Sequence, residues 1–186
     1  MNIKRLTSLM LVALLALTAC QTPGGKPDAT AAARLDRDVD AALRNLYDTT
    51  PAARNLARRA KGILVFPGVV KAGFIGGAQY GTGALRKHGR TVAYYNLVAG
   101  SYGLQAGVQS FDYAMFFMTD SALDYLDRSE GFEVGVGPSV VVVDAGIAKS
   151  LTTTTAQDDV YAFIFAQQGL MAGLGVQGSK ITRINP

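Results

Sequence analysis

The feature that most constrains the fold is a two-residue periodicity that begins after Gly62 and continues almost to the C-terminus. Successive side chains of a strand point to opposite faces, so this period predicts a β-sheet. The segments that follow it are rich in Val, Tyr, Phe and Gly and comprise residues 63–66, 72–86, 91–98, 102–118, 132–143, 159–165 and 170–184. His88-Gly89 lies between two of them and predicts a hairpin turn. We therefore expect a mostly antiparallel sheet.

Three helices are predicted beside this sheet. Apolar residues recur at helical spacing in residues 31–48, and charged residues occupy the remaining face, which indicates a helix packed on the core. A helix lying on a membrane surface is the alternative. Thr50-Pro51 is a start signal and Gly62 a stop, so a second helix covers residues 51–61. A third helix covers residues 120–126. The expected class is α+β: two N-terminal helices, then a Gly-rich sheet curved toward a barrel or sandwich, with one short inserted helix.

Glycine occupies one face of several predicted strands. In residues 102–109, Gly103 and Gly107 point to the side opposite Tyr102 and Val108, and residues 132–139 and 170–178 repeat the pattern. A face almost without side chains allows a sheet to bend toward closure, or allows another chain to approach closely. Two interpretations follow: tight curvature, and a groove that accepts a lipid acyl chain.

The N-terminus has the pattern of a lipoprotein signal. Lys4 and Arg5 precede an apolar run over residues 6–17, which is too short to cross a bilayer of about 30 Å. The run ends in Leu-Thr-Ala-Cys, which resembles a bacterial lipobox with Cys20 as the residue that receives diacylglycerol and, with it, palmitate or similar chains. We predict a signal peptide over 1–19, a lipidated tether over 20–30 and a domain over 31–186. The alternative is an ordinary secretory peptide with a chance Cys. Gln21 after the Cys favours the outer membrane, facing the periplasm.

Charge is segregated along the chain after the signal. Residues 21–48 carry a net charge of −1, residues 49–111 carry +8 without any acidic residue, and residues 112–186 carry −5. A basic block on an envelope protein predicts contact with anionic phospholipid headgroups, whereas a secreted chain has no access to nucleic acid. The alternative is solvated charge or pairing with the acidic half. The candidate headgroup ligands are Lys61, Lys71, Arg54, Arg58, Arg59, Arg86, Lys87 and Arg90.

The sequence offers little for catalysis. One Cys and one His leave no Cys/His zinc site, and His88 falls in a turn without a partner nucleophile. We therefore predict no enzymatic activity, no metal and no cofactor. An enzymatic alternative would need a cleft with perturbed carboxylates around Asp144, Asp158 or Asp159.

Three ordered blocks of sequence carry a family resemblance. They are Ala-Lys-Gly-Ile-Leu-Val-Phe-Pro at 60–67 continuing to Tyr-Gly-Thr-Gly at 80–83, then Gly-Ser-Tyr-Gly-Leu-Gln-Ala-Gly-Val-Gln at 100–109 with Asp112, then Tyr161 with Gly-Leu-Met-Ala-Gly-Leu-Gly-Val-Gln-Gly at 169–178. With them the chain resembles the SYLF domain family over residues 31–184. One departure is residues 143–149, where many relatives have a Gly-Pro-x-Gly-Arg turn.

The resemblance implies lipid binding, because eukaryotic relatives bind phosphoinositide-containing membranes through basic residues near the N-terminal helices. Lys61 and Lys71 match motif positions, whereas Arg54, Arg58 and Arg59 correspond only by region. In a bacterial envelope, phosphatidylglycerol, cardiolipin or a lipid A phosphate would replace the phosphoinositide, and the actin binding of some relatives has no evident counterpart. We expect a non-enzymatic, membrane-anchored lipoprotein that binds anionic phospholipid. The alternative is a structural or interaction module with a periplasmic protein partner.

Overall fold

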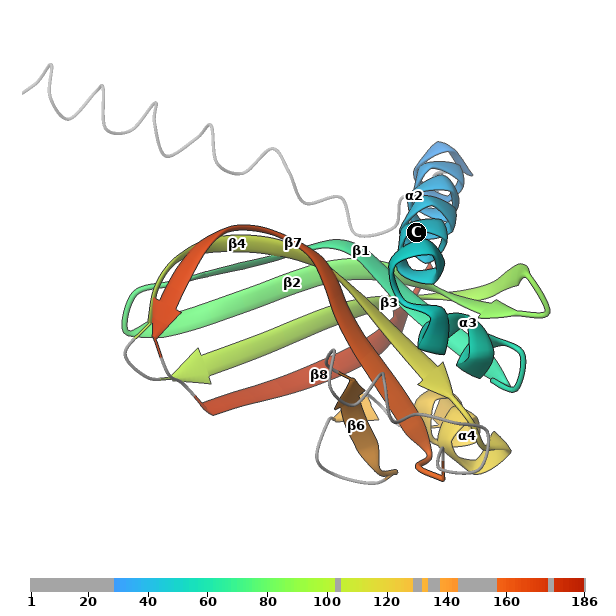
Figure 1. Ribbon diagram of the computed structural model, residues 1–186. Coiled ribbons are helices and arrows are strands. Elements are labelled where there is room, and N and C mark those ends of the chain that lie inside the picture. Colours follow the sequence, from blue (N-terminus) through green and yellow to red (C-terminus); the bar gives the residue numbers. More distant parts are fainter. Residues whose placement is uncertain are drawn as a thin grey trace, which may run out of the picture.

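The computed structural model describes residues 29–102, 105–128, 132–133, 138–143, 157–173 and 176–185. The predicted signal peptide, Cys20 and most of the tether lie outside the described residues. The elements run in the order α2 (Ala29–Thr49), α3 (Pro51–Ala57), β1 (Gly62–Gly73), β2 (Gly76–Lys87), β3 (Arg90–Tyr102), β4 (Gln105–Phe117), α4 (Asp120–Arg128), β5 (Phe132–Glu133), β6 (Val140–Val143), β7 (Val160–Gly173) and β8 (Val176–Ile184) (Figure 1).

These strands form one eight-stranded sheet in the order β5-β8-β3-β2-β1-β4-β7-β6. Neighbours pair antiparallel, apart from β6, which runs parallel to β7. The sheet curls into a half-barrel, with two helices before it in the chain and α4 inserted (Figure 1). The predicted α+β class, the order of helices and sheet, and the curvature are confirmed.

The connections between strands show where the curl is tightest. The chain passes from Tyr102 to Gln105 in three residue steps, a reach of about 11 Å. In a flat sheet β3 and β4 would lie about 14 Å apart, because β2 and β1 separate them. The three steps from Gly173 to Val176 likewise join strands that a flat sheet would hold about 24 Å apart. The sheet therefore closes most strongly at the end where these connections and the β1–β2 turn meet, here called the turn end.

Glycine lines the concave side at the turn end. In the strand register Gly73 lies opposite Gly77 on one side and Gly107 on the other. A Cβ atom at Gly73 would stand 2.7 Å from the carbonyl oxygen of Gly76, too close for any side chain. The β1–β2 turn thus requires glycine at this position. This arrangement supports tight curvature as the reason for the glycine face.

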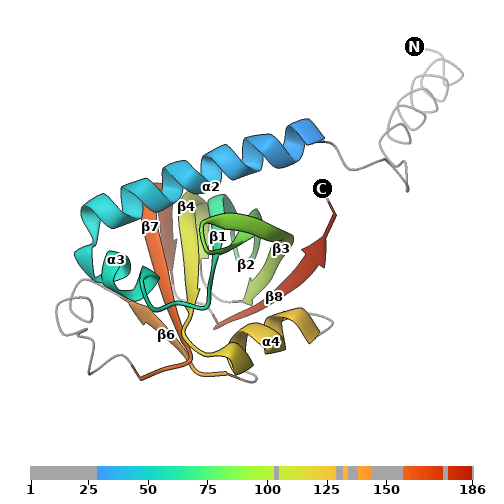
Figure 2. The ribbon, with the colours of Figure 1, turned by 90° about the vertical axis from the view of Figure 1, so that its right-hand side faces the viewer.

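Apolar side chains cover both faces of the sheet at the opposite end, here called the helical end. On the convex face α2 and α3 pack Val39, Leu46 and Leu56 against a layer that includes Phe116 and Phe163. On the concave face the buried side chains of α4 join a cluster from six strands that includes Leu64, Phe66, Tyr95, Met115, Phe117 and Ile181. Figure 2 shows α2 lying across one side of the sheet and α4 on the other. The turn end extends beyond both.

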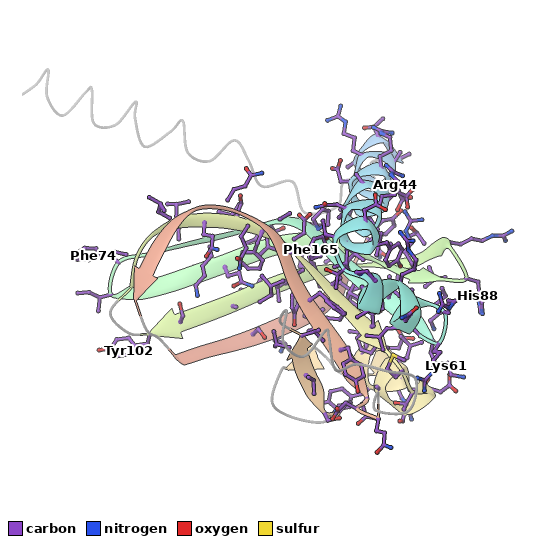
Figure 3. The ribbon with its side chains drawn as sticks, in the orientation of Figure 1. Arg44, Lys61, Phe74, His88, Tyr102 and Phe165 are labelled. Carbon is purple, nitrogen blue, oxygen red and sulfur yellow. The ribbon has the colours of Figure 1, made fainter. Side chains whose placement is uncertain are left out.

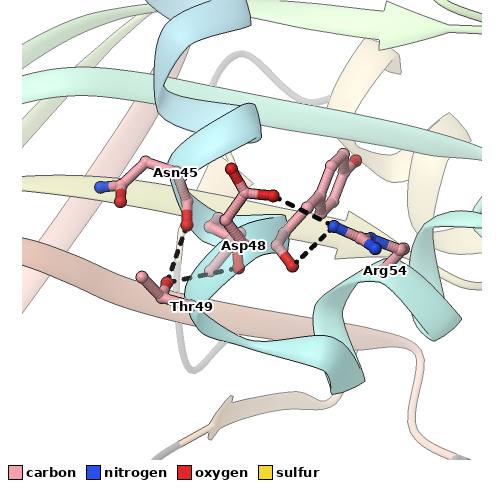
Figure 4. Close-up of polar contacts among 6 residues, drawn as sticks. Asn45, Asp48, Thr49 and Arg54 are labelled. Atoms are coloured by element: carbon pink, nitrogen blue, oxygen red, sulfur yellow. Dashed lines mark hydrogen bonds and ion pairs between the residues drawn. The ribbon is translucent and has the colours of Figure 1, made fainter.

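The helices begin and end at recognisable residues. Thr49 Oγ1 donates a hydrogen bond to the Asn45 carbonyl oxygen, 2.8 Å away, at the end of α2, and Pro51 opens α3 (Figure 4). The prediction that the second helix extends to residue 61 is wrong, because α3 ends at Ala57. Within the described part of the chain, no helix has both the length and the apolar character that a bilayer crossing requires.

Several strand boundaries also differ from the prediction. Residues 67–71 continue β1, and the break between two strands falls instead at Phe74 and Ile75. Pro67-Gly68 reads as a strand end, but a bulge absorbs it: the register shifts between Phe66 and Val69, and Gly68 adopts φ +60°. Its amide donates a 2.8 Å hydrogen bond to Asp112 Oδ1.

In the C-terminal strands, too, a strand irregularity lies where a break between strands was predicted. The predicted break between residues 165 and 170 is a second irregularity, with Ala166 at φ 52°, inside the continuous strand β7. Residues 170–184 therefore belong to two strands, β7 and β8, rather than to one. Within the predicted strand 132–143, the described residues form β5 at the start and β6 at the end.

Candidate functional site

The eight predicted headgroup ligands do not form one surface. Lys71 lies on the concave face near the turn end, and the other seven lie at the helical end. Lys61 directly precedes β1 and Lys71 lies near the end of that strand. They are ten residues apart, which corresponds to roughly 30 Å along a strand. In Figure 3, Lys61 and His88 lie at the end of the molecule opposite Phe74 and Tyr102.

Several cations at the helical end pair with carboxylates. Arg54 Nη2 lies 3.2 Å from Asp48 Oδ1 and also donates to the Tyr47 carbonyl oxygen, so that it links α3 to the end of α2 (Figure 4). Lys61 lies 3.3 Å from Asp120, and Lys87 lies 3.9 Å from Asp127, both on α4. Exposed pairs of this kind stabilise a fold by only about 0–1 kcal/mol each. The two pairs with α4 correspond to the predicted pairing between the basic block and the acidic half.

The side chain of Arg86 joins the sheet to α2. Its side chain is only 12% exposed, and Nη2 donates to Asp40 Oδ1 at 2.6 Å and to the Asp36 carbonyl oxygen at 2.9 Å. Thr91 Oγ1 donates to Asp36 Oδ1 at 2.7 Å. These bonds fasten β2 and β3 to α2, so Arg86 is held under the helix and does not face solvent. Of the remaining basic residues at this end, Arg58 donates to Asn55 Oδ1, and Arg58, Arg59 and Arg90 are exposed.

A cavity of about 240 Å³ lies inside the curl of the sheet, between the glycine-lined turn end and the concave core. Its polar wall is one cross-strand row: in the register Lys71 lies opposite both Gln79 and Gln109, and Gln79 is followed across β3 by Ser179 on β8. The deeper wall is mostly apolar. The described lining comprises Lys71, Gln79, Leu97, Gln109, Phe111, Tyr113, Val142, Ile164, Gln167 and Ser179.

The cavity lining is cationic. Burial raises the pKa of Tyr113 to about 12, so its hydroxyl stays neutral at physiological pH. Among the described lining residues Lys71 carries a charge and none is acidic. The lysine ammonium and the carboxamide NH₂ groups are hydrogen-bond donors suited to an anionic oxygen. Ligand pockets usually measure about 300–1,000 Å³, so the size of this cavity suits a small anionic group better than a whole phospholipid.

The carboxylates considered for an enzymatic site have structural partners. Asp159 accepts hydrogen bonds from Thr119 Oγ1 at 3.0 Å and from the Ser139 amide at 3.2 Å, which joins β6, β7 and the start of α4. Asp158 accepts one from the Tyr161 hydroxyl. Asp144 lies outside the described residues. Where the structure describes the chain, no group of three or more His, Cys, Asp or Glu side chains is placed to hold a metal ion.

The sequence pattern alone did not identify most of the cavity. The alternation in residues 102–109 placed Gln109 on the glycine face, and the structure shows that this face is concave. Gln79, Gln167 and Ser179 come from three other strands, and no local motif connects them. These residues could have been identified only from the sheet order, which brings β8 and β7 to opposite sides of the same cavity.

One family model matches the chain. Residues 98–185 match the Ysc84 family, described as "Las17-binding protein actin regulator". This is the SYLF family that the sequence blocks resemble; the match contains the second and third blocks, whereas the block with Lys61 and Lys71 precedes it. No curated protein matches the chain. Residues 98–185 therefore belong to the Ysc84, or SYLF, family.

Proposed function

We propose that the protein is a non-enzymatic envelope lipoprotein, anchored through Cys20 in the outer membrane and facing the periplasm, that binds an anionic phospholipid headgroup. The observation that carries this proposal is the position of Lys71 in a concave cavity whose described lining holds no acidic side chain. A phosphate group there would meet one ammonium and several carboxamide groups. The resemblance to the SYLF family, whose eukaryotic relatives bind phosphoinositide-containing membranes, supports the same class of ligand.

The anchor and the cavity have separate roles in this proposal. Two or three acyl chains contribute about 0.8 kcal/mol for each CH₂ that they bury, and hence tens of kcal/mol together. A single lysine near an anionic surface adds about 1 kcal/mol. Cys20 therefore determines that the protein stays on a membrane, and the cavity determines which headgroup it prefers. The tether between Cys20 and Ala29 has a maximum reach of roughly 30 Å, so the domain stays close to the bilayer.

The basic residues of the helical end have a secondary role in the proposed lipid binding. Arg54, Lys61 and Lys87 each have a carboxylate partner, and Arg86 is buried under α2. Paired cations neutralise neighbouring acidic groups and contribute less to the attraction of an anionic surface. We assign headgroup selectivity to Lys71 and only general attraction to the exposed cations of the helical end.

A second candidate is an envelope interaction module with a periplasmic protein partner. The description of the matching family names a protein, Las17, and this favours protein binding as the alternative. In that case the cavity would be irrelevant to lipid, and Cys20 alone would hold the domain at the membrane. The two candidates differ in what the domain does once the anchor is removed.

The test uses the chain from Thr22 onward, which lacks the acyl anchor and keeps every described element. We expect it to sediment with vesicles that contain phosphatidylglycerol and to stay in solution with pure phosphatidylcholine. Binding should weaken as salt rises from 50 to 500 mM, because surface electrostatics are screened over about 10 Å at 0.1 M. Equal sedimentation with both vesicles would contradict headgroup recognition and favour the interaction module.

A further inference from the structure

Large apolar side chains are exposed at the turn end of the half-barrel. Phe74 is 74% exposed, Tyr102 is 77% exposed and Leu170 is 88% exposed, and Ile75 beside Phe74 is more than half exposed. Figure 3 shows Phe74 and Tyr102 at the same end of the molecule, away from the helices. Isolated exposed apolar residues are common, but a group of this size at one end indicates a contact surface.

The fold brings these residues together from distant parts of the sequence. Phe74 and Ile75 form the β1–β2 turn, which Gly73 makes possible, while Tyr102 ends β3 and Leu170 lies near the end of β7. The short connections that close the sheet hold the three strand ends at one end of the barrel. We call this group of four side chains, Phe74, Ile75, Tyr102 and Leu170, the apolar tip.

The strand segments that lead to the apolar tip carry charge of one sign. The strand segments that lead to it, residues 69–82, 96–110 and 164–180, contain Lys71 and Lys180 and no Asp, Glu or Arg. Nine acidic residues lie between 112 and the C-terminus, yet none falls in these segments. Lys180 lies opposite Glu133 of β5 in the strand register, so Lys71 carries the charge complementarity. Apolar side chains in front of this lysine complement a bilayer that has anionic headgroups above its hydrocarbon.

The distance from Lys71 to the apolar tip matches the depth of a membrane interface. Lys71 precedes Phe74 by three residues, or about 10 Å along β1. Side chains bound at a membrane surface enter the boundary between headgroups and acyl chains by about 5–10 Å. With Phe74 and Ile75 at that boundary, Lys71 lies at the level of the headgroup phosphates, and Tyr102 has an amphipathic ring suited to the same depth.

We propose that the apolar tip is a membrane-docking surface that enters the periplasm-facing leaflet of the bilayer to which the protein is attached, and so turns the Lys71 cavity toward the headgroups. This inference rests on the proposed membrane location but not on headgroup selectivity. A charge-free protein surface, or a second copy of the chain, would cover the apolar side chains equally well but would give no reason for a lysine, Lys71, behind them.

The test exploits the absence of tryptophan from the chain. The variants Phe74→Trp and Tyr102→Trp each place a single tryptophan on the tip, and Val92→Trp places one at an exposed position of β3 near the helical end as the matched control. Each full-length chain is reconstituted into phosphatidylcholine/phosphatidylglycerol vesicles with and without bromine on the acyl chains. Bromine quenches tryptophan only at short range, so quenching reports contact with the hydrocarbon.

We expect the two tip tryptophans to shift their emission to shorter wavelength and to lose at least half of their intensity in brominated vesicles, while the control at position 92 changes by less than a tenth. Absence of quenching at positions 74 and 102 would overturn the docking surface. Equal quenching at position 92 would do so too, because the domain would then lie along the membrane without orientation. A blue shift that depends on protein concentration and not on bromine would identify a second copy as the occupant.

Failure of this test is distinct from failure of headgroup recognition. A chain whose tip stays unquenched can still distinguish anionic from neutral vesicles when the anchor is absent. A chain whose tip is quenched equally in pure phosphatidylcholine docks without headgroup selectivity. The two experiments therefore examine the tip and the Lys71 cavity independently.

Discussion

Phe116→Ala is expected to lower the free energy of unfolding by about 3–5 kcal/mol, the range for removing a buried aromatic ring. Phe116 on β4 is fully buried in the convex layer between the sheet and the two N-terminal helices. Its ring meets Phe163 of β7 edge to face, with 5.2 Å between centroids. The substitution leaves a cavity between sheet and helices that neither element can fill without moving. Denaturant titration followed by circular dichroism measures the loss.

Phe74→Ala is the matched control, since it removes the same ring from a residue on the apolar tip. Exposed substitutions usually change stability by less than about 0.5 kcal/mol, and we expect the midpoint of Phe74→Ala to remain at the wild-type value. The pair therefore separates an apolar residue that holds the fold together from one that the fold presents to a partner. A loss of several kcal/mol at Phe74 would mean that the tip is packed within the protein, contrary to its exposure.

Lys71→Glu is expected to weaken binding of the unanchored chain to phosphatidylglycerol vesicles by roughly 10- to 150-fold. A hydrogen bond to a charged group contributes about 1.5–3 kcal/mol, and each 1.4 kcal/mol corresponds to a factor of ten in affinity. The substitution also places a carboxylate against the phosphate. Vesicle titration at constant ionic strength measures the affinity, and the unfolding midpoint confirms that the variant is folded.

Lys61→Glu provides the control for net charge, because it makes the same change at the other end of β1 and disrupts only an exposed pair with Asp120. We expect it to weaken binding less than threefold. Equal losses for both variants would assign the attraction to total charge rather than to the cavity. No loss for Lys71→Glu would leave the interaction module as the better account of the domain.

The local sequence pattern was sufficient to predict the helices and strands of this fold, but not the residues at which they begin and end. The two-residue period and the glycine face of residues 102–109 indicated a curved sheet, and the curl of the half-barrel confirms it. The breaks at Pro67-Gly68 and near Ala166 were predicted wrongly because both are bulges. A bulge uses the same residue types as a turn, and only pairing with the neighbouring strand distinguishes the two.

The candidate site was predictable in its chemistry but not in its location. The excess of cations in residues 49–111 indicated an anionic partner, yet the contour of β1 separates Lys61 from Lys71 by most of the length of the sheet. Pairing with α4 across the molecule could not be read from spacing, since Asp120 and Asp127 lie far from their partners in sequence. The apolar tip was missed for the same reason: Phe74, Tyr102 and Leu170 are neighbours only after the sheet closes.

The proposed function requires that an anionic headgroup binds inside the concave cavity beside Lys71. Its most direct test is a nuclear magnetic resonance titration of the unanchored chain with short-chain phosphatidylglycerol, and with short-chain phosphatidylcholine as the reference. We expect chemical-shift changes specific to phosphatidylglycerol at Lys71 and at the side-chain amides of Gln79 and Gln109. Specific changes confined to Arg54, Lys61 and Lys87 at the helical end, with none in the cavity, would contradict it.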